Sequence, residues 1–134
     1  MTLSEKILAL RQCSLFEGVG DSEITAIAEI CRARKFMAGS VITRAHEVPQ
    51  RLLIVTNGSL QQLNGQPLSA VYDVPSLVLN LAPVRDVVAD PQLGAECLMI
   101  SKSHFFTIIQ ECPSVLVNVL TEADPERSKA SFAA

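Results

Sequence analysis

The stretch LLIVTNGSLQQL, residues 52–63, indicates the fold class. Residues 52–56 are consecutively apolar or β-branched, which is typical of a short buried strand. The Asn-Gly pair at 57–58 is a strong hairpin signal, because both central positions of a type I′ turn need a positive φ. Residues 59–63 then have the pattern of a returning strand. The stretch therefore predicts a hairpin in a β-rich domain.

Short strands separated by turn residues continue on both sides of this stretch. Gly39, the Asn64-Gly65 pair and Gly94 mark turns between them. Many short strands at this spacing are typical of a sandwich or a jelly roll. The further predicted strands are 41–43, 68–72, 84–89 and 96–100.

Helical periodicity flanks the β-rich region. A helix is predicted over residues 4–12 with Ser4 as its cap, and a second over 21–32 with Asp21 as its cap. The second has apolar residues at i, i+3, i+4 and i+7, so one face packs on something apolar. The helical period resumes over residues 102–121, interrupted by one proline.

Length and composition fit one domain. The chain has 134 residues, of which 49% are apolar and 19% charged, enough for a real core and too apolar for general disorder. We expect a mainly β fold with flanking helices: a double-stranded β-helix jelly roll over about 34–101, with two N-terminal helices and a C-terminal helical segment. The domain would span residues 1–121, followed by a flexible tail over 122–134.

The charge balance argues against nucleic acid as a partner. Eleven basic and fourteen acidic residues give a net charge of −3, without the concentrated basic face that phosphates require. Arg32, Arg34 and Lys35 form a basic cluster where the second helix is predicted to end. The helix dipole favours cations at that position, so we interpret them as helix-terminal residues.

The cysteines and the chain start point to the cytoplasm. No apolar run approaches the ~18–20 residues that span a bilayer, and no signal-peptide pattern opens the sequence, so we expect no membrane association. The cysteines lie far apart without a C-x-x-C pair, which predicts free, buried thiols. They are Cys13, Cys31, Cys97 and Cys112.

Several segments together resemble cyclic-nucleotide-binding domains. LFEG at 15–18 and FMAGSVI at 36–42 are similar to the entry of those domains. The strand at 52–55 followed by Gly58 looks like their next signature, and ECLMI at 96–100 before a phenylalanine looks like their last strand. The resemblance covers most of the chain and implies a jelly roll closed into a pouch, with helices over its open edge and ends.

The same resemblance locates a candidate ligand pocket. In the family, a short helix between two late strands presents backbone N–H groups to the cyclic phosphate. A glutamate at its start holds the ribose 2′-hydroxyl, and an arginine at its end pairs with the phosphate. Here, aligned on Pro83, the arginine position holds Val84. The glutamate position holds Pro75, and the preceding glycine is Val74.

These departures predict a degenerate pocket. Arg85 follows one residue late, and a one-residue shift in an extended segment turns a side chain to the opposite face. A local bulge would instead let Arg85 reach inward, and this alternative stays open. His46 stands where the family often has glycine before an acidic residue, and we expect it to be a turn residue. The pocket residues implied by the resemblance are Val74, Pro75, Ser76, Leu77, Val84 and Arg85.

Catalytic chemistry finds little support. Jelly-roll metal enzymes need several His and Glu on neighbouring strands, and His46 and His104 are too few. No nucleophile–base set or phosphate-binding loop occurs. Asp73, Asp86 and Asp90 are expected to be turn or solvated residues. We expect no catalytic residue, no metal site and no cofactor.

The resulting hypothesis is a non-catalytic regulatory or interaction module that does not bind cAMP or cGMP. The alternative is a genuine sensor of a small ligand or cyclic nucleotide with a remodelled pocket; a divergent jelly-roll enzyme is a remote third. The partner is an unknown protein or small ligand. Phe105 and Phe106 are adjacent on the C-terminal helix, so one should pack inward and the other near the surface, where it would support a homodimer. The opposite expectation, full burial under the N-terminal helices, stays open.

Overall fold

The computed structural model describes residues 1–68, 71–72 and 74–122, and only the backbone at 75, 76, 78 and 122. The predicted tail over 123–134 lies outside the described residues. The helices are α1 (Leu3–Arg11), α2 (Asp21–Ile30), α3 (Val74–Leu79), α4 (Lys102–Glu111) and α5 (Pro113–Glu122), with a 3₁₀ turn η1 (Ser14–Phe16). The strands are β1 (Arg32–Phe36), β2 (Val41–Thr43), β3 (Arg51–Gly58), β4 (Leu60–Gln62), β5 (Val71–Tyr72), β6 (Val87–Ala89) and β7 (Ala95–Ser101).

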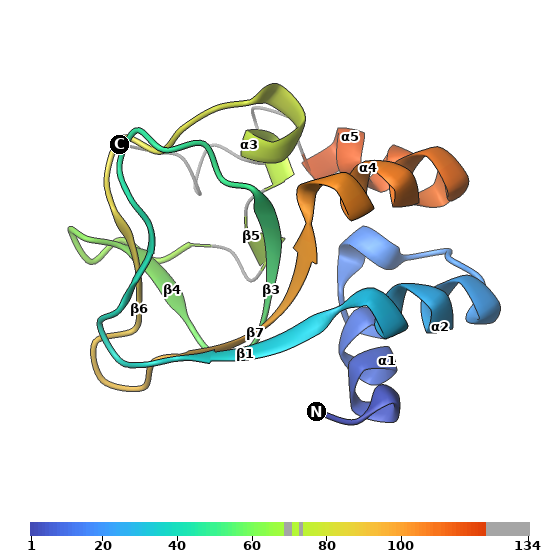
Figure 1. The fold of residues 1–134 in the computed structure, drawn as a ribbon, viewed down its shortest axis with the longest axis horizontal. Coiled ribbons are helices and arrows are strands. Elements are labelled where there is room, and N and C mark those ends of the chain that lie inside the picture. Colours follow the sequence, from blue (N-terminus) through green and yellow to red (C-terminus); the bar gives the residue numbers. More distant parts are fainter. Residues whose placement is uncertain (69–70, 73, 123–134) are drawn as a thin grey trace.

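The strands form two antiparallel sheets. The four-stranded sheet has the order β1-β7-β3-β5, and the three-stranded sheet the order β2-β6-β4. Figure 1 shows the two sheets at the centre and left, with α1, α2, α4 and α5 at the right, against the four-stranded sheet. This arrangement confirms the predicted jelly roll with flanking helices. Within the described residues, no helix combines the length and apolar character needed to cross a bilayer.

Successive side chains of β7 point to opposite faces of the sheet and so contribute to two separate apolar cores. Leu98 and Ile100 point to the helices, whereas Ala95 and Cys97 point to the second sheet. The helix-side core includes Leu10, Leu15, Phe16, Ile24, Ile27, Leu52, Ile54, Leu98, Ile100, Phe105 and Val115. The inter-sheet core includes Phe36, Ile42, Leu53, Leu60, Tyr72, Val87, Ala89, Ala95 and Cys97.

The predicted hairpin at 57–58 is wrong. Asn57 lies within β3 opposite Glu96 of β7, and β4 belongs to the other sheet. Only Gly58 of the pair has a positive φ, of 74°. A Cβ at Gly58 would lie 2.2 Å from the carbonyl oxygen of Gly94, so glycine is required where the chain crosses between the sheets.

The second predicted turn, at Asn64-Gly65, is confirmed. The backbone N–H of Gln62 donates to the carbonyl of Gln66 over 2.8 Å, and that of Gly65 donates to the carbonyl of Gln62 over 2.8 Å. Gly65 has a φ of 91°, which an L side chain rarely adopts.

The predicted helix caps are displaced. Thr2 caps α1 and accepts the N–H of Glu5 at 3.2 Å, so Ser4 lies inside the helix. Gly20 is the N-cap of α2, and Asp21 is its first residue, paired with Arg11 of α1. In both cases a preceding residue in extended conformation occupies the cap position.

The basic cluster is not at a helix terminus. Helix α2 ends at Ile30, Cys31 is extended, and Arg32, Arg34 and Lys35 lie on β1. Every residue of β1 pairs with β7, a contact distant in sequence that overrides the local helical pattern. The helix-dipole interpretation is therefore wrong for this cluster.

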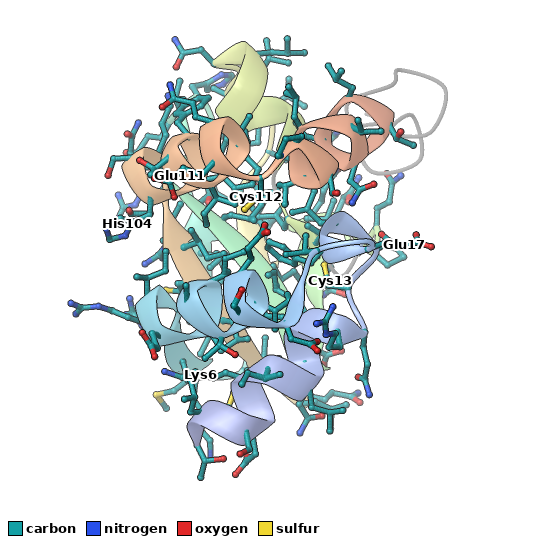
Figure 2. The ribbon with its side chains drawn as sticks, turned by 90° about the vertical axis from the view of Figure 1, so that its right-hand side faces the viewer. Lys6, Cys13, Glu17, His104, Glu111 and Cys112 are labelled. Atoms are coloured by element: carbon teal, nitrogen blue, oxygen red, sulfur yellow. The ribbon has the colours of Figure 1, made fainter. Side chains whose placement is uncertain are left out.

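The two adjacent phenylalanines divide as expected. Phe105 is fully buried in the helix-side core, whereas Phe106 is 37% exposed. Full burial of both rings under the N-terminal helices is thereby excluded. Figure 2 views this helical side, with Cys13 and Cys112 among its labelled residues; both thiols are buried, as are those of Cys31 and Cys97.

Candidate functional site

Helix α3 occupies the place where the resemblance locates the phosphate-binding segment. Val74 and Leu77 are each 1% exposed and belong to the helix-side core. Leu79, at the end of α3, is exposed, and Asn80 follows with a φ of 57°. The apolar side of α3 therefore anchors the segment beneath the helices. The side chains of Pro75 and Ser76 lie outside the described part.

The segment after α3 is held to the loop between β2 and β3. The Pro83 carbonyl accepts the N–H of His46 over 2.8 Å, and the Asp86 carboxylate accepts the N–H of Ala45 over 2.7 Å. His46 is exposed with a φ of 67°, which is turn geometry, as expected from the sequence. These two bonds fix the ends of a short bend over Val84 and Arg85.

Within this bend, Val84 and Arg85 differ sharply. Val84, at the family's arginine position, is 60% exposed. Arg85 is half-buried, and its Nη1 is enclosed without a hydrogen-bond partner among the described residues. The enclosed Nη1 agrees with the alternative in which a local bulge lets Arg85 reach inward, and that alternative stays a prediction.

Two more polar side chains occupy the interior between the two sheets. Gln62 is 7% exposed and lies opposite Val87 in the β4–β6 pair, so it shares the face of the inter-sheet core. Its Oε1 is enclosed without a hydrogen-bond partner among the described residues. Tyr72, 4% exposed, belongs to the same core.

This arrangement offers donors and an acceptor rather than acid–base chemistry. A guanidinium pairs best with carboxylate or phosphate oxygens, and an amide both accepts and donates. His46 and His104 are exposed, and no group of three metal-ligating side chains lies together in the described ranges. Sequence reasoning missed Gln62 and Tyr72; the period-two spacing of Gln62 from Leu60 is the signal that marks the former as inward-facing.

Of the three aspartates expected to be turn or solvated residues, two stabilise turns or bends. Asp90 accepts the N–H groups of Gln92 and Leu93 and the hydroxyl of Ser59, and the two backbone bonds lower the pKa of its carboxyl. Asp86 anchors the bend described above. Asp73 lies outside the described residues.

Comparison with known proteins gives structural relatives only. No family profile and no curated protein matches this sequence. The regulatory subunit of a cAMP-independent protein kinase A from Trypanosoma brucei is similar, with a TM-score of 0.75 and 20% identity, over 98% of this chain and 50% of that one. The catabolite activator protein of Thermus thermophilus has a TM-score of 0.70 and 20% identity, over 90% of this chain and 61% of that one.

A third relative is a sensor domain of similar size. The sensor domain of the transcriptional regulator DNR from Pseudomonas aeruginosa has a TM-score of 0.70 and 11% identity, over 90% of this chain and 91% of that domain. The chain thus spans only about half to three-fifths of the first two relatives and nearly all of the third. Together with the two sheets, the intervening α3 and the flanking helices, these similarities show that the chain has the fold of cyclic-nucleotide-binding domains.

Proposed function

We propose that this chain is a non-catalytic regulatory or interaction module that does not bind cAMP or cGMP at physiological concentrations. The observation that carries this proposal is the exposed Val84 at the position of the phosphate-binding arginine. Pro75 at the glutamate position adds to it, because proline supplies neither a carboxylate nor a backbone N–H.

The energetic consequence of these two replacements is large. Removing one partner of a buried guanidinium–phosphate pair costs about 2–5 kcal/mol. Losing the carboxylate–hydroxyl hydrogen bond costs roughly 1.5–3 kcal/mol more. Because each ~1.4 kcal/mol is a factor of ten, the affinity falls by about 10³-fold or more, and a micromolar ligand becomes millimolar.

The structural relatives are compatible with such a role. The Trypanosoma brucei relative is described as part of a cAMP-independent kinase, and a triple mutant of it as bound to cAMP. A protein of this fold therefore works in a kinase that does not depend on cAMP. We also infer a cytoplasmic location, supported by four buried cysteines that remain free thiols.

Calorimetric titration with both cyclic nucleotides tests the proposal. We expect no saturable heat below about 1 mM for the unmodified chain. The Pro75→Glu/Val84→Arg double variant restores the two lost groups and should gain affinity, while Val84→Gln is the control for a polar change at that position. Saturable binding to the unmodified chain below about 100 μM, abolished by Arg85→Ala, would contradict the proposal.

A second candidate function is a sensor of a different small ligand in the pouch. The enclosed Nη1 of Arg85 and Oε1 of Gln62 favour it, because unpaired buried polar atoms destabilise a protein by about 1–3 kcal/mol each unless a ligand pairs them. A panel of small carboxylates and phosphates in a thermal-shift assay, with native mass spectrometry of the purified chain, tests this candidate. A true ligand raises the melting temperature of the unmodified chain and not of Arg85→Gln. Equal shifts in both proteins would refute it.

A further inference from the structure

An unneutralised group of arginines lies on one face of the four-stranded sheet. Arg32 is opposite Met99 in the β1–β7 pair, and Arg51 is opposite Ser101 in the β3–β7 pair. Arg34 follows Arg32 by two residues, so all three arginines share the face of Phe36 and the inter-sheet core. Arg32 and Arg34 are exposed and Arg51 is half-buried. We call these three arginines, with the nearby His104, the basic face.

Two of these arginines lie over one aromatic ring. The guanidinium carbons of Arg34 and Arg51 are 4.8 and 5.6 Å from the centre of the Phe36 ring. Contact with the ring holds both cations in place, which lowers the entropic cost of binding an anion. Burial and the neighbouring positive charge of Arg34 lower the pKa of Arg51, as expected for cations held close together.

The arginines have no ion-pair partner among the described residues. The ion pairs of the described residues are Arg11–Asp21 and Lys35–Glu96, and neither involves the basic face. Lys35, on the same strand but on its other face, is therefore paired, whereas Arg32 and Arg34 are not. Three like charges without a counter-ion reduce stability, and a bound anion would relieve that repulsion.

A groove adjoins the basic face. Its volume is about 480 Å³, and its walls come from the end of α2, from β1, β3 and β7 and from the start of α4. Figure 2 shows His104 directed outward at the start of α4. The lining residues are Glu29, Ile30, Arg32, Arg51, Met99, Ser101 and His104. Only Glu29 among them is acidic, so the groove is positive with two apolar side chains, those of Ile30 and Met99.

We propose that this groove binds an acidic segment of a partner protein. The backbone positions of Arg32 and Arg34 are about 6.6 Å apart along β1, and Arg51 lies two strands away, about 9.5 Å. Because these cations are anchored at separate backbone positions, an extended segment can meet them with several carboxylates. Ile30 and Met99 suit apolar side chains between the acidic ones. A nucleic acid fits less well, because the chain is net negative and lacks an extended basic track.

The test is an NMR titration of the isotope-labelled full chain. The probe is a peptide of about twelve residues with glutamate at alternate positions and serine and leucine between them; its control carries glutamine instead of glutamate. We expect amide shifts around residues 30–34, 51 and 99–104 with the acidic peptide only, weakening as salt is added. No shift at these residues would overturn the proposal.

Matched variants separate the basic face from general electrostatics. Arg34→Gln and Arg51→Gln should each lower the affinity for the acidic peptide two- to fivefold. The double variant should lower it about tenfold or more. Lys35→Gln removes the same charge from the opposite face of β1 and should leave affinity unchanged. Arg34→Gln should melt at the same or a slightly higher temperature, which shows that lost binding is not lost folding.

Two outcomes would overturn the proposal even if binding occurs. One is an equal loss of affinity in Lys35→Gln and Arg34→Gln. The other is tighter binding of a single-stranded oligonucleotide of the same charge at the same residues. Neither depends on whether the pouch binds a cyclic nucleotide, so this test stands apart from the calorimetric one.

Discussion

The two faces of the four-stranded sheet differ in what they bury. The helix-side core is apolar throughout, filled by side chains from all four long helices and from β3 and β7. The inter-sheet core also encloses Gln62, Tyr72 and Nη1 of Arg85, and its exposed continuation carries the basic face. Figure 1 shows the helices on one side of β7 and β3 and the three-stranded sheet on the other.

This difference separates stability from binding. A dry apolar core stabilises a fold in proportion to the area it buries. Polar atoms without a hydrogen-bond partner among the described residues, here Gln62 Oε1 and Arg85 Nη1, weaken a fold and are typical of a surface or pouch adapted to something else. The helix side should therefore respond strongly to truncation, whereas polar positions on the inter-sheet side should tolerate or even benefit from apolar replacement.

The largest expected effect is the loss of Phe105. Phe105→Ala removes a fully buried ring from the helix-side core and should lower the free energy of unfolding by about 3–5 kcal/mol. Phe106→Ala, its neighbour with 37% exposure, should cost less than about 1 kcal/mol. Urea denaturation measures both. Similar losses in the two variants would break the distinction between core and surface on α4.

A smaller loss of stability is expected at alkaline pH. One buried thiol from each core, Cys31 and Cys97, contributes to it. Burial raises the pKa of Cys31 and of Cys97 from 9.0 to about 11. Below pH 9 both thiols are protonated whether the chain is folded or not. Between pH 9 and 11 only the unfolded chain ionises, so each thiol removes up to about 2–3 kcal/mol of stability as the pH rises.

Variants isolate this contribution from other groups that titrate at high pH. The stability difference between the unmodified chain and Cys31→Ala should shrink from pH 8 to pH 11, and likewise for Cys97→Ala. A constant difference would show that the folded thiols ionise normally. As a control, thiol titration of the denatured, unreduced protein should find all four cysteines.

Replacing the buried amide of Gln62 tests the inter-sheet side. Gln62→Leu removes an enclosed oxygen without a hydrogen-bond partner among the described residues, while keeping the backbone bonds. We expect unfolding to become about 1 kcal/mol more unfavourable, a gain of stability. Thermal and urea denaturation measure it. A loss above about 1 kcal/mol would mean that this amide serves the fold itself.

The smallest expected effect is weak self-association through the C-terminal helices. Phe106, Leu116, Val117 and Leu120 on α4 and α5 are exposed by 37%, 43%, 62% and 63%. We propose a homodimer with a dissociation constant on the order of 100 μM to 1 mM. Light scattering across protein concentration detects it, and Leu120→Gln should abolish it. A monomeric mass at the highest concentration would argue against this interface.

The sequence allowed the helix-side core to be predicted well. Ile24, Ile27 and Ala28 on α2 recur at helical spacing, and all are buried as that spacing predicts. Such patterns arise within one element, so local periodicity is sufficient to find them. The strand before Gly58 was also predicted, because a short continuous run of apolar and β-branched residues is typical of a buried strand.

Features that depend on pairing between segments far apart in the sequence could not be predicted from local patterns. The Asn57-Gly58 pair has a hairpin sequence, but Gly94 and β7 decide its geometry. Arg32 follows a helical pattern, yet pairing with Met99 makes it part of a strand. Whether Arg85 points inward depends on the bend that His46 and Asp86 fix from two other segments.

The position of β7 at the centre of its sheet has a consequence for how the chain folds during synthesis. β7 lies between β1 and β3, yet it is the last of the described strands to be made, ending at Ser101. Until then β1 has no neighbour within the sheet, and β3 has only the short β5. Forming contacts between strands so distant in sequence is slow, because the entropy of loop closure is lost before the stabilising contacts are made. Until β7 is made, the emerging chain therefore has exposed strand edges that can misassemble. A nascent chain stopped before Ala95 should stay protease-sensitive from β1 onward, whereas one extended through α4 should become resistant in a single step.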